Sequence, residues 1–364
     1  DYSNSSFIAK INKIQQDKKY YLFDYLAHLI LRSILDQEKY SIGQEYQKVL
    51  KQTENSNNDD FVSNKESKCF IAICQELNFG RICASYELVI DNNMELYLRK
   101  TFNGNVNEKS IKHEQEILNQ NLSPFIVRPL KTNANEIILP YFPIGSLESI
   151  FIETQSSQRT IEFTLVDKFV IILEIATALN DLHENEQYHG NLCSDFIFIN
   201  SSKDAYLGGF CYDRETENES TKIPHPIMYR APETDNEQME LSDVYSFGVL
   251  MHEILTNKSL PCRFKNNTRD QFLEIKNGDY FKFLFSKSDG NEFFDEKNGI
   301  EEMKEIIEKC MKIDKKDRFQ SFNELIQKVR EVNLYNRNKD EIEFRLSKAV
   351  KSEDENLIGS TSII

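Results

Sequence analysis

The feature that most constrains the fold is a change of apolar spacing part-way along the chain. Between residue 70 and about residue 142, short strand-like runs are bounded by Asn, Gly and Pro, as in RICASYELVI, MELYLRKTF and EIILPYF. Beyond these runs the apolar residues recur mostly at helical spacing. Strands first and helices afterwards predict an α+β fold with two lobes.

Two long helices are predicted in the second part of the chain. Thr164 to His183 places its apolar residues on one face, whereas Leu241 to Leu255 is apolar nearly all round. The second pattern is typical of a buried central helix. Ser321 and Glu324 form an S-x-x-E capping box, which predicts the start of a last helix.

Composition divides the chain into successive segments. We predict an N-terminal helical extension at 1–52, a polar linker at 53–69, a main domain at 70–332 with lobes at 70–139 and 143–332, and a C-terminal helix and tail at 333–364. The extension carries one apolar stripe between Leu22 and Ile34. We interpret this stripe as a surface that docks on the chain's own domain, with a partner site as the alternative.

Charge and cysteine content narrow the class of protein. Lys and Arg number 44 and Asp and Glu number 59, so the net charge is −15. Such an acidic chain is a poor partner for nucleic acid or an anionic membrane, which select for clustered cations. The seven cysteines show no zinc or disulfide spacing, and no apolar run reaches the ~18 residues of a membrane helix. We therefore expect an intracellular protein, cytoplasmic and without membrane insertion.

A series of motifs follows in a fixed order from Lys100 to Arg318. They are LYLRK, HEQEIL, ILPYFPIGSL, HGNLCSDFIFI, GGFC, YRAPE, DVYSFGV and KIDKKDRF. At this spacing they resemble the motifs of the protein kinase superfamily. The resemblance implies a two-lobed fold, with an antiparallel sheet and a C-helix in a small N-lobe and a larger, mainly helical C-lobe.

The resemblance also implies a preserved structural framework. Lys100 would pair with Glu114 of the C-helix, and Glu233 would form a buried ion pair with Arg318. Asp243 would fix the backbone of the catalytic loop. The apolar stack that joins the lobes in this family would contain Leu118, His189 and Phe210.

The nucleotide pocket implied by the resemblance is altered. Lys100 and Glu114 remain, and Leu139 would be the gatekeeper. Pro140, Tyr141 and Phe142 would line the adenine slot, but Leu98 replaces a small alanine. Overfilling a packed slot costs roughly 1–3 kcal/mol. The glycine-rich loop, aligned with QELNFGRI, keeps only Gly80. We expect no cofactor, and weak ATP binding without metal stays open as an alternative.

The positions that carry chemistry in kinases are replaced. Asn191 stands at the position of the catalytic base, and an amide cannot accept the substrate proton. Cys193 replaces the lysine two residues further on, and Gly190 replaces the arginine that precedes the base. Phe196 and Gly209 stand where the two Mg²⁺ ligands belong, so we expect neither catalytic residues nor a metal site.

These replacements are typical of a pseudokinase. The leading interpretation is a catalytically inactive scaffold or allosteric regulator in intracellular signalling, whose partners are proteins such as an active kinase or a signalling assembly. The alternative is a residually active or atypical Ser/Thr or Tyr protein kinase that binds ATP. In that case Asp195, Asp213, Glu215 or Glu217 would recruit the metal. A third hypothesis assigns the biology to the N-terminal helix and the tail.

Overall fold

The computed structural model divides the chain into two compact units, which we describe separately. The sheet unit contains the described residues 71–102 and 129–142, and the helical unit contains those of 106–128 and 144–350. The residues that the structure describes are 71–77, 84–90, 96–102, 106, 108–142, 144–155, 161–210, 229–233, 239–257, 301–348 and 350, with the backbone alone at 71–77, 88, 90, 153 and 155.

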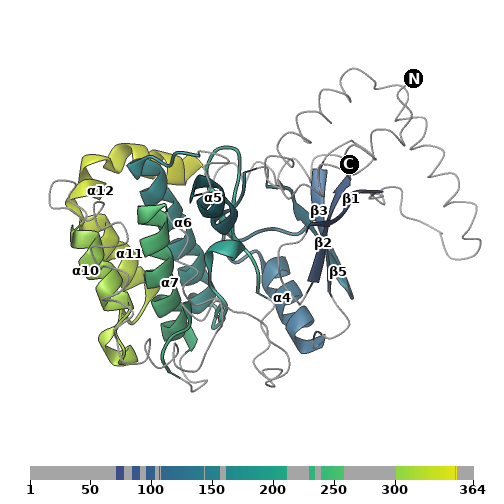
Figure 1. Cartoon of the computed structure of the whole chain (residues 1–364). Coiled ribbons are helices and arrows are strands. Elements are labelled where there is room, and N and C mark those ends of the chain that lie inside the picture. Colours follow the sequence, from purple (N-terminus) through teal and green to yellow (C-terminus); the bar gives the residue numbers. More distant parts are fainter. Residues whose placement is uncertain are drawn as a thin grey trace, which may run out of the picture. The chain divides into compact units, whose positions relative to one another are not determined.

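The sheet unit is one antiparallel sheet of five strands in the order β1-β2-β3-β5-β4. Figure 1 labels β1, β2, β3 and β5. The strands are β1 Ile71–Leu77, β2 Ala84–Ile90, β3 Leu96–Phe102, β4 Lys131–Asn133 and β5 Glu136–Pro140. The three strands expected from the sequence are β2, β3 and β5. The fully buried side chains of Val89, Ile137 and Ile138 belong to its core.

The register of this sheet places the expected pocket residues beside one another. Leu98 on β3 pairs with Leu139 on β5, and Lys100 pairs with Ile137 on one side and Tyr86 on the other. Cross-strand partners point to the same face of a sheet. Leu98, Lys100 and Leu139 therefore line one face, and all three are buried.

The helical unit contains seven named helices and a small sheet among its described residues. The helices are α4 Glu108–Gln120, α5 Leu147–Gln155, α6 Leu165–Glu184, α7 Met239–Thr256, α10 Glu301–Cys310, α11 Phe322–Glu331 and α12 Asn333–Arg337. The sheet has the order β6-β7-β8, with β6 at Gly145–Ser146, β7 at Ile197–Ile199 and β8 at Ala205–Leu207. Short 3₁₀ turns lie at Ser194–Phe196 and Lys315–Asp317.

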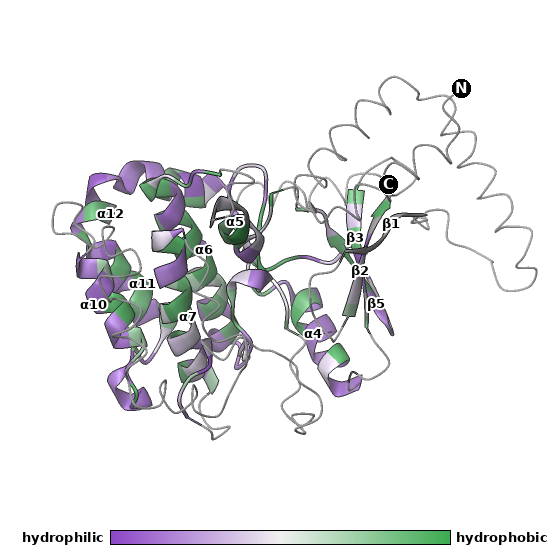
Figure 2. Ribbon diagram, viewed as in Figure 1, coloured by the Kyte–Doolittle hydropathy of each residue, from purple (hydrophilic) through white to green (hydrophobic). Residues whose placement is uncertain are grey.

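Helices α6 and α7 form the centre of this unit. Both are hydrophobic along most of their length in Figure 2, and α7 is buried at every position from Leu241 to Leu255, as predicted. The single apolar stripe predicted for α6 is too narrow, because Lys168 and Glu174 are buried as well. The reason is packing on several sides, since α6 contacts α7, α11 and β8.

The buried lysine of α6 joins the two central helices. Lys168 donates a hydrogen bond from Nζ to the carbonyl oxygen of Leu255, at 2.6 Å, in the last turn of α7. A cation at this end complements the negative end of the helix dipole. Burial lowers the pKa of Lys168 to about 8, so the charged form is held at a cost.

The segment predicted as a C-terminal helix packs on the helical unit over its described residues. Tyr335 of α12 lies against Phe169 of α6, with ring centroids 6.3 Å apart. Helical residues continue over 339–348, where Ile342 is fully buried. Arg345 donates to Asp167 at 2.5 Å, which fixes this segment to the beginning of α6.

Several predicted segments fall in the other unit or outside the described residues. Residue 106 and residues 108–128, which fall within the predicted lobe at 70–139, group with the helical unit. The extension at 1–52, the linker at 53–69, Gly80 and the tail from 351 lie outside the described residues. Among the helices that the structure describes, none is both long and apolar enough to cross a membrane.

Candidate functional site

The loop from His189 to Phe196 is held by a buried carboxylate on α7. Asp243 accepts a hydrogen bond from the backbone N–H of His189 at 2.7 Å and another from Gly190 at 2.8 Å. His183 Nε2 lies 3.0 Å from the same carboxylate. Gly190 has a φ of +69°, a left-handed conformation that favours glycine over a residue with a Cβ. Asp243 thus holds the loop backbone in the way the motifs imply.

His189 is a structural residue of this loop. Its Nδ1 accepts the backbone N–H of Asn191 at 3.2 Å, so the ring proton belongs on Nε2. Nε2 can then donate to the carbonyl oxygen of Gly208, 2.9 Å away. Both ring nitrogens are occupied by backbone contacts and the side chain is buried. The ring is therefore committed to holding the backbone around it.

The positions at which a kinase would carry its base and its lysine hold groups without that chemistry. Asn191 is 6% exposed, and its Oδ1 has no hydrogen-bond partner among the residues that the structure describes. An amide neither gains nor releases a proton near neutral pH. Cys193 is 1% exposed, a position typical of a small packed side chain more than of a reactive thiol. Cys211, in the GGFC motif, lies outside the described residues.

Phe196 fills the space that a side chain at position 209 would need. A Cβ built on Gly209 would overlap the Phe196 ring, with Cε1 at 2.5 Å and Cδ1 and Cγ closer still. Gly209 also has a φ of +83°, which disfavours residues with a Cβ. The backbone N–H of Gly208 donates to the carbonyl oxygen of Phe196 at 3.0 Å, so the two segments are directly linked.

This arrangement does not fit the magnesium ions that the resemblance implies. Mg²⁺ prefers near-octahedral oxygen coordination, usually with one or two carboxylates. Phe196 and Gly209 supply no side-chain oxygen, and an aromatic ring fills the space beside Gly209. Across the described residues, no group of three or more His, Cys, Asp or Glu side chains is arranged to hold a metal ion.

Two of the three side chains predicted to form a stack, His189 and Phe210, lie against each other. Phe210 is fully buried, and its ring centroid lies 4.9 Å from that of His189. Phe196 lies on the same imidazole at 6.0 Å. Leu118 on α4 is buried at 2% exposure. His189 therefore lies beside one aromatic ring of its own motif, HGNLCSDFIFI, and one ring of GGFC.

A buried polar cluster that the sequence did not indicate lies behind the loop. The Ser194 hydroxyl donates to Glu148 at 2.6 Å and lies 2.9 Å from the Tyr229 hydroxyl. Tyr229 in turn donates to Glu253 on α7. Burial and then the Glu253 carboxylate raise the pKa of Tyr229 well above its usual range, so the phenol keeps its proton. The only sequence signal was Tyr229 itself, within YRAPE.

The ion pair between Glu233 and Arg318 is present and bidentate. The two guanidinium nitrogens NH1 and NH2 lie 2.8 and 2.7 Å from the two carboxylate oxygens. Burial works to raise the pKa of Glu233, but the hydrogen bonds and charge of Arg318 outweigh it and the pKa is lowered. Tyr245, the residue that replaces the usual tryptophan of DVWSFG, lies under the guanidinium at 5.1 Å. The fork geometry makes this pair strong.

The remaining pocket residues lie in the sheet unit, apart from Glu114. Lys100 is 3% exposed, and its Nζ lies 4.9 Å from the centroid of the Phe102 ring. Tyr141 and Phe142 follow β5 and are half-buried. Glu114 lies on α4 in the helical unit and is 1% exposed. The pairing of Lys100 with Glu114 stays a prediction of the motifs.

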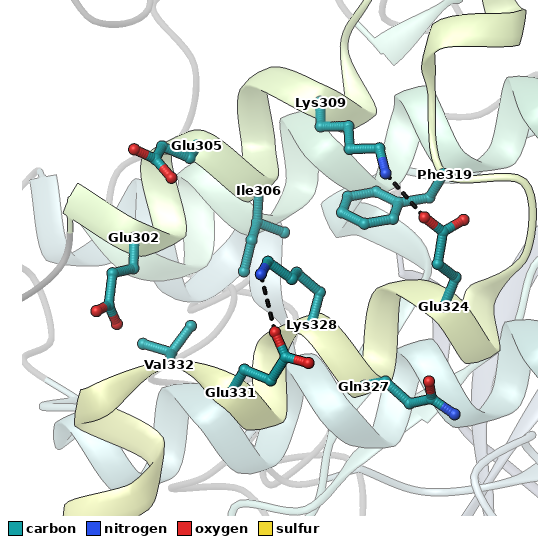
Figure 3. Close-up of a pocket in the computed structure, with 10 residues that line it drawn as sticks. All are labelled: Glu302, Glu305, Ile306, Lys309, Phe319, Glu324, Gln327, Lys328, Glu331 and Val332. Atoms are coloured by element: carbon teal, nitrogen blue, oxygen red, sulfur yellow. Dashed lines mark hydrogen bonds and ion pairs between the residues drawn. The ribbon is translucent and has the colours of Figure 1, made fainter.

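A groove between α10 and α11 is the alternative location for a site. It has a volume of about 680 Å³ and is lined by Glu302, Glu305, Ile306, Lys309, Phe319, Glu324, Gln327, Lys328, Glu331 and Val332 (Figure 3). Both of its cations already pair, Lys309 with Glu324 and Lys328 with Glu331, each at 2.8 Å. Glu302 accepts hydrogen bonds from Asn333. These contacts give the groove no feature that points to a ligand.

Comparison with known proteins decides the family. A family model described as protein tyrosine and serine/threonine kinase matches residues 74–329. The chain belongs to the protein kinase family. This range spans every motif from LYLRK to KIDKKDRF, so the kinase fold and its two-part organisation are shown for this chain.

The kinase domain is similar to several curated plant proteins. An inactive leucine-rich repeat receptor-like serine/threonine-protein kinase of Arabidopsis thaliana is 23% identical over 199 residues, covering 52% of this chain and 32% of that protein. A probable inactive receptor kinase of the same plant is 26% identical over 196 residues, covering 52% and 30%. A probable L-type lectin-domain containing receptor kinase is 36% identical over 132 residues, covering 33% and 19%. The chain thus spans about a third or less of the length of these relatives.

Proposed function

We propose that this kinase domain is catalytically inactive and acts as a scaffold or allosteric regulator in intracellular signalling. The observation that carries the proposal is the Phe196 ring beside Gly209, because it takes both metal-ligand positions out of use at once. Asn191 removes the base in the same loop. The names of two relatives, which describe those proteins as inactive, add support.

Magnitudes favour an inactive domain over a slow enzyme. Loss of general-base help typically costs 10²–10⁴ in rate. A metal ion contributes several kcal/mol of charge stabilisation in the transition state. Kinases turn over at ~1–100 s⁻¹, so the combined loss leaves little phosphotransfer to observe. Among the acidic residues that could replace the ligands, Asp213, Glu215 and Glu217 lie outside the described residues.

The framework supports a binding role. Asp243, Arg318 and the His189–Phe210 stack keep the loops of the helical unit in place with protein contacts. A domain that keeps its surface while its chemistry is replaced can still present that surface to another protein. We assign it protein partners, such as an active kinase or a signalling assembly, an intracellular and cytoplasmic location, and no required cofactor.

A phosphotransfer assay tests the proposal directly. The full chain is incubated with labelled ATP and Mg²⁺ or Mn²⁺, with generic protein substrates and alone. We expect no incorporation above that of a Lys100→Met control. Labelled phosphate that appears with the natural chain and disappears with Lys100→Met would show that the domain is an active kinase.

A thermal-shift titration with ATP separates binding from catalysis. A ligand at 100 times its Kd stabilises a protein by about 2.7 kcal/mol. We expect no metal-dependent shift at millimolar ATP. A small shift that is equal with and without Mg²⁺ would indicate weak, metal-independent nucleotide binding, and a shift that requires the metal would contradict the proposal.

A further inference from the structure

Phe196 and Gly209 are mutually dependent, although thirteen positions separate them. The ring lies where a Cβ at position 209 would be, so it fits only because position 209 has none. Its Cγ and Cδ1 are close to the backbone of Phe196 and cannot move away as the end of a long chain could. The side chain is 8% exposed and lies against His189, which limits other rotamers.

Three contacts with other protein groups hold the segment Gly208–Phe210. The carbonyl oxygen of Phe196 accepts the Gly208 N–H at 3.0 Å. His189 Nε2 lies 2.9 Å from the Gly208 carbonyl oxygen. The Phe210 ring packs on the same imidazole and is fully buried. Each of these contacts joins the loop of Phe196 to the segment of Gly209.

We propose that the Phe196 ring is a fixed internal replacement for the metal-bound nucleotide. It fills the space beside Gly209 and locks Gly208–Phe210 against His189 without any ligand. This inference rests on the proposed function as an inactive domain, and it states what controls the conformation of that domain. The partner-binding state of the helical unit is then set by this ring and not by ATP or divalent cations.

A double-mutant cycle on the full chain tests the lock. The variants are Phe196→Ala, Gly209→Ala and both together, compared by thermal unfolding. Phe196→Ala should lower Tm by about 6 °C or more, as expected for removing a buried ring. Gly209→Ala should cost about 4 °C more in the natural background than beside Phe196→Ala, because only the natural ring opposes the new methyl group.

Two further variants keep this cycle decisive. Gly248 on α7 also lacks room for a Cβ, which would lie 2.7 Å from Cys310 and 2.9 Å from Met311. Gly248→Ala therefore shows the cost of an added methyl group away from Phe196, and this cost should be equal with and without Phe196→Ala. If Phe196→Ala fails to fold, Phe196→Leu serves in its place, because leucine keeps most of the apolar volume without the planar ring. Equal costs of Gly209→Ala in both backgrounds would overturn the lock.

Hydrogen exchange measures the ligand independence. In the natural chain, exchange of the Gly208 amide should change less than twofold when millimolar ATP, Mg²⁺ or both are added. In Phe196→Ala the same amide should exchange at least about tenfold faster relative to the core of α7, because the local opening no longer has to displace the ring. Slowing of the natural chain's exchange by Mg²⁺ with ATP would overturn the inference.

The two proposals fail separately. Phosphotransfer by the natural chain would remove the proposed function while leaving the coupling of Phe196 and Gly209 intact. An additive cycle without phosphotransfer would remove the lock and leave an inactive domain that lacks it.

Discussion

Replacing Arg318 by lysine should destabilise the helical unit strongly even though the charge is kept. All five N–H donors of the guanidinium form hydrogen bonds. Two donate to Glu233, and the other three donate to the carbonyl oxygens of Lys312, Leu241 and Ile313. A lysine ammonium has three donors at one point. One of these hydrogen bonds, to Leu241, is buried and the other four are part-buried. At least two acceptors therefore lose their partners, at ~1–3 kcal/mol each. The expected cost is about 2–6 kcal/mol, a large part of a typical stability of ~5–15 kcal/mol.

The matched control is the same substitution on the surface. Arg330 pairs with Glu343 at 3.2 Å, but the two side chains are 45% and 38% exposed. Arg330→Lys should change stability by less than ~1 kcal/mol, as is usual for exposed ion pairs. Urea unfolding of both variants, followed by far-UV circular dichroism, gives the two free energies. Equal losses for Arg318→Lys and Arg330→Lys would refute the argument from donor geometry.

Three other predictions concern groups inside the helical unit. Burial lowers the pKa of Lys168 to about 8, so between pH 8 and 10.5 the unfolded chain binds this proton more tightly than the folded chain does, and the contribution of Lys168 to stability rises with pH. The free energy of unfolding of Lys168→Met, measured in urea, should therefore fall by roughly 2–3 kcal/mol relative to that of the natural chain between pH 7 and 10. Burial raises the pKa of Glu174 well above 4.5, so the folded chain keeps a proton that the unfolded chain releases, and stability falls as pH rises. The Tm of Glu174→Gln relative to that of the natural chain should therefore increase from pH 5 to pH 8, and a constant difference in Tm would contradict this. Ile342→Ala should cost about 2–5 kcal/mol because Ile342 is fully buried, whereas Phe344→Ala, at a residue 66% exposed, should change stability by less than ~0.5 kcal/mol in the same unfolding assay.

The sequence predicted those parts of the fold whose signal is local. The apolar spacing of α6 and α7 and the short runs of β2, β3 and β5 are visible in any window of ten to twenty residues. The capping of α6 was missed although it is equally local. Thr164 and Asp167 form a reciprocal capping box at the start of α6. At α11 the Ser321 hydroxyl accepts the backbone N–H of Glu324, but the Glu324 carboxylate accepts the backbone N–H of Gln320 and not that of Ser321.

Long-range contacts could be predicted only where a family motif marked both partners. Glu233 and Arg318 are 85 residues apart, and composition alone gives no reason to join them. The overlap of Phe196 with Gly209 was not predicted, because it depends on the direction of one ring and on a φ of +83°. A signal existed in the complementary volumes, since one ligand position gained a large side chain and the other lost its side chain altogether.

The link between Arg345 and Asp167 has a consequence for the order of events during protein synthesis. Asp167 belongs to the capping box at the beginning of α6, yet its arginine partner is 178 residues further along the chain. At a translation rate of ~5–20 residues per second, roughly 10–35 s separate the appearance of the two side chains. During that interval the Asp167 carboxylate keeps two donors among the described residues, the backbone N–H of Thr164 and the ammonium group of Lys203, each 2.8 Å away. A ribosome-bound chain that ends before Arg345 should therefore expose the first turn of α6 to chaperones and proteases.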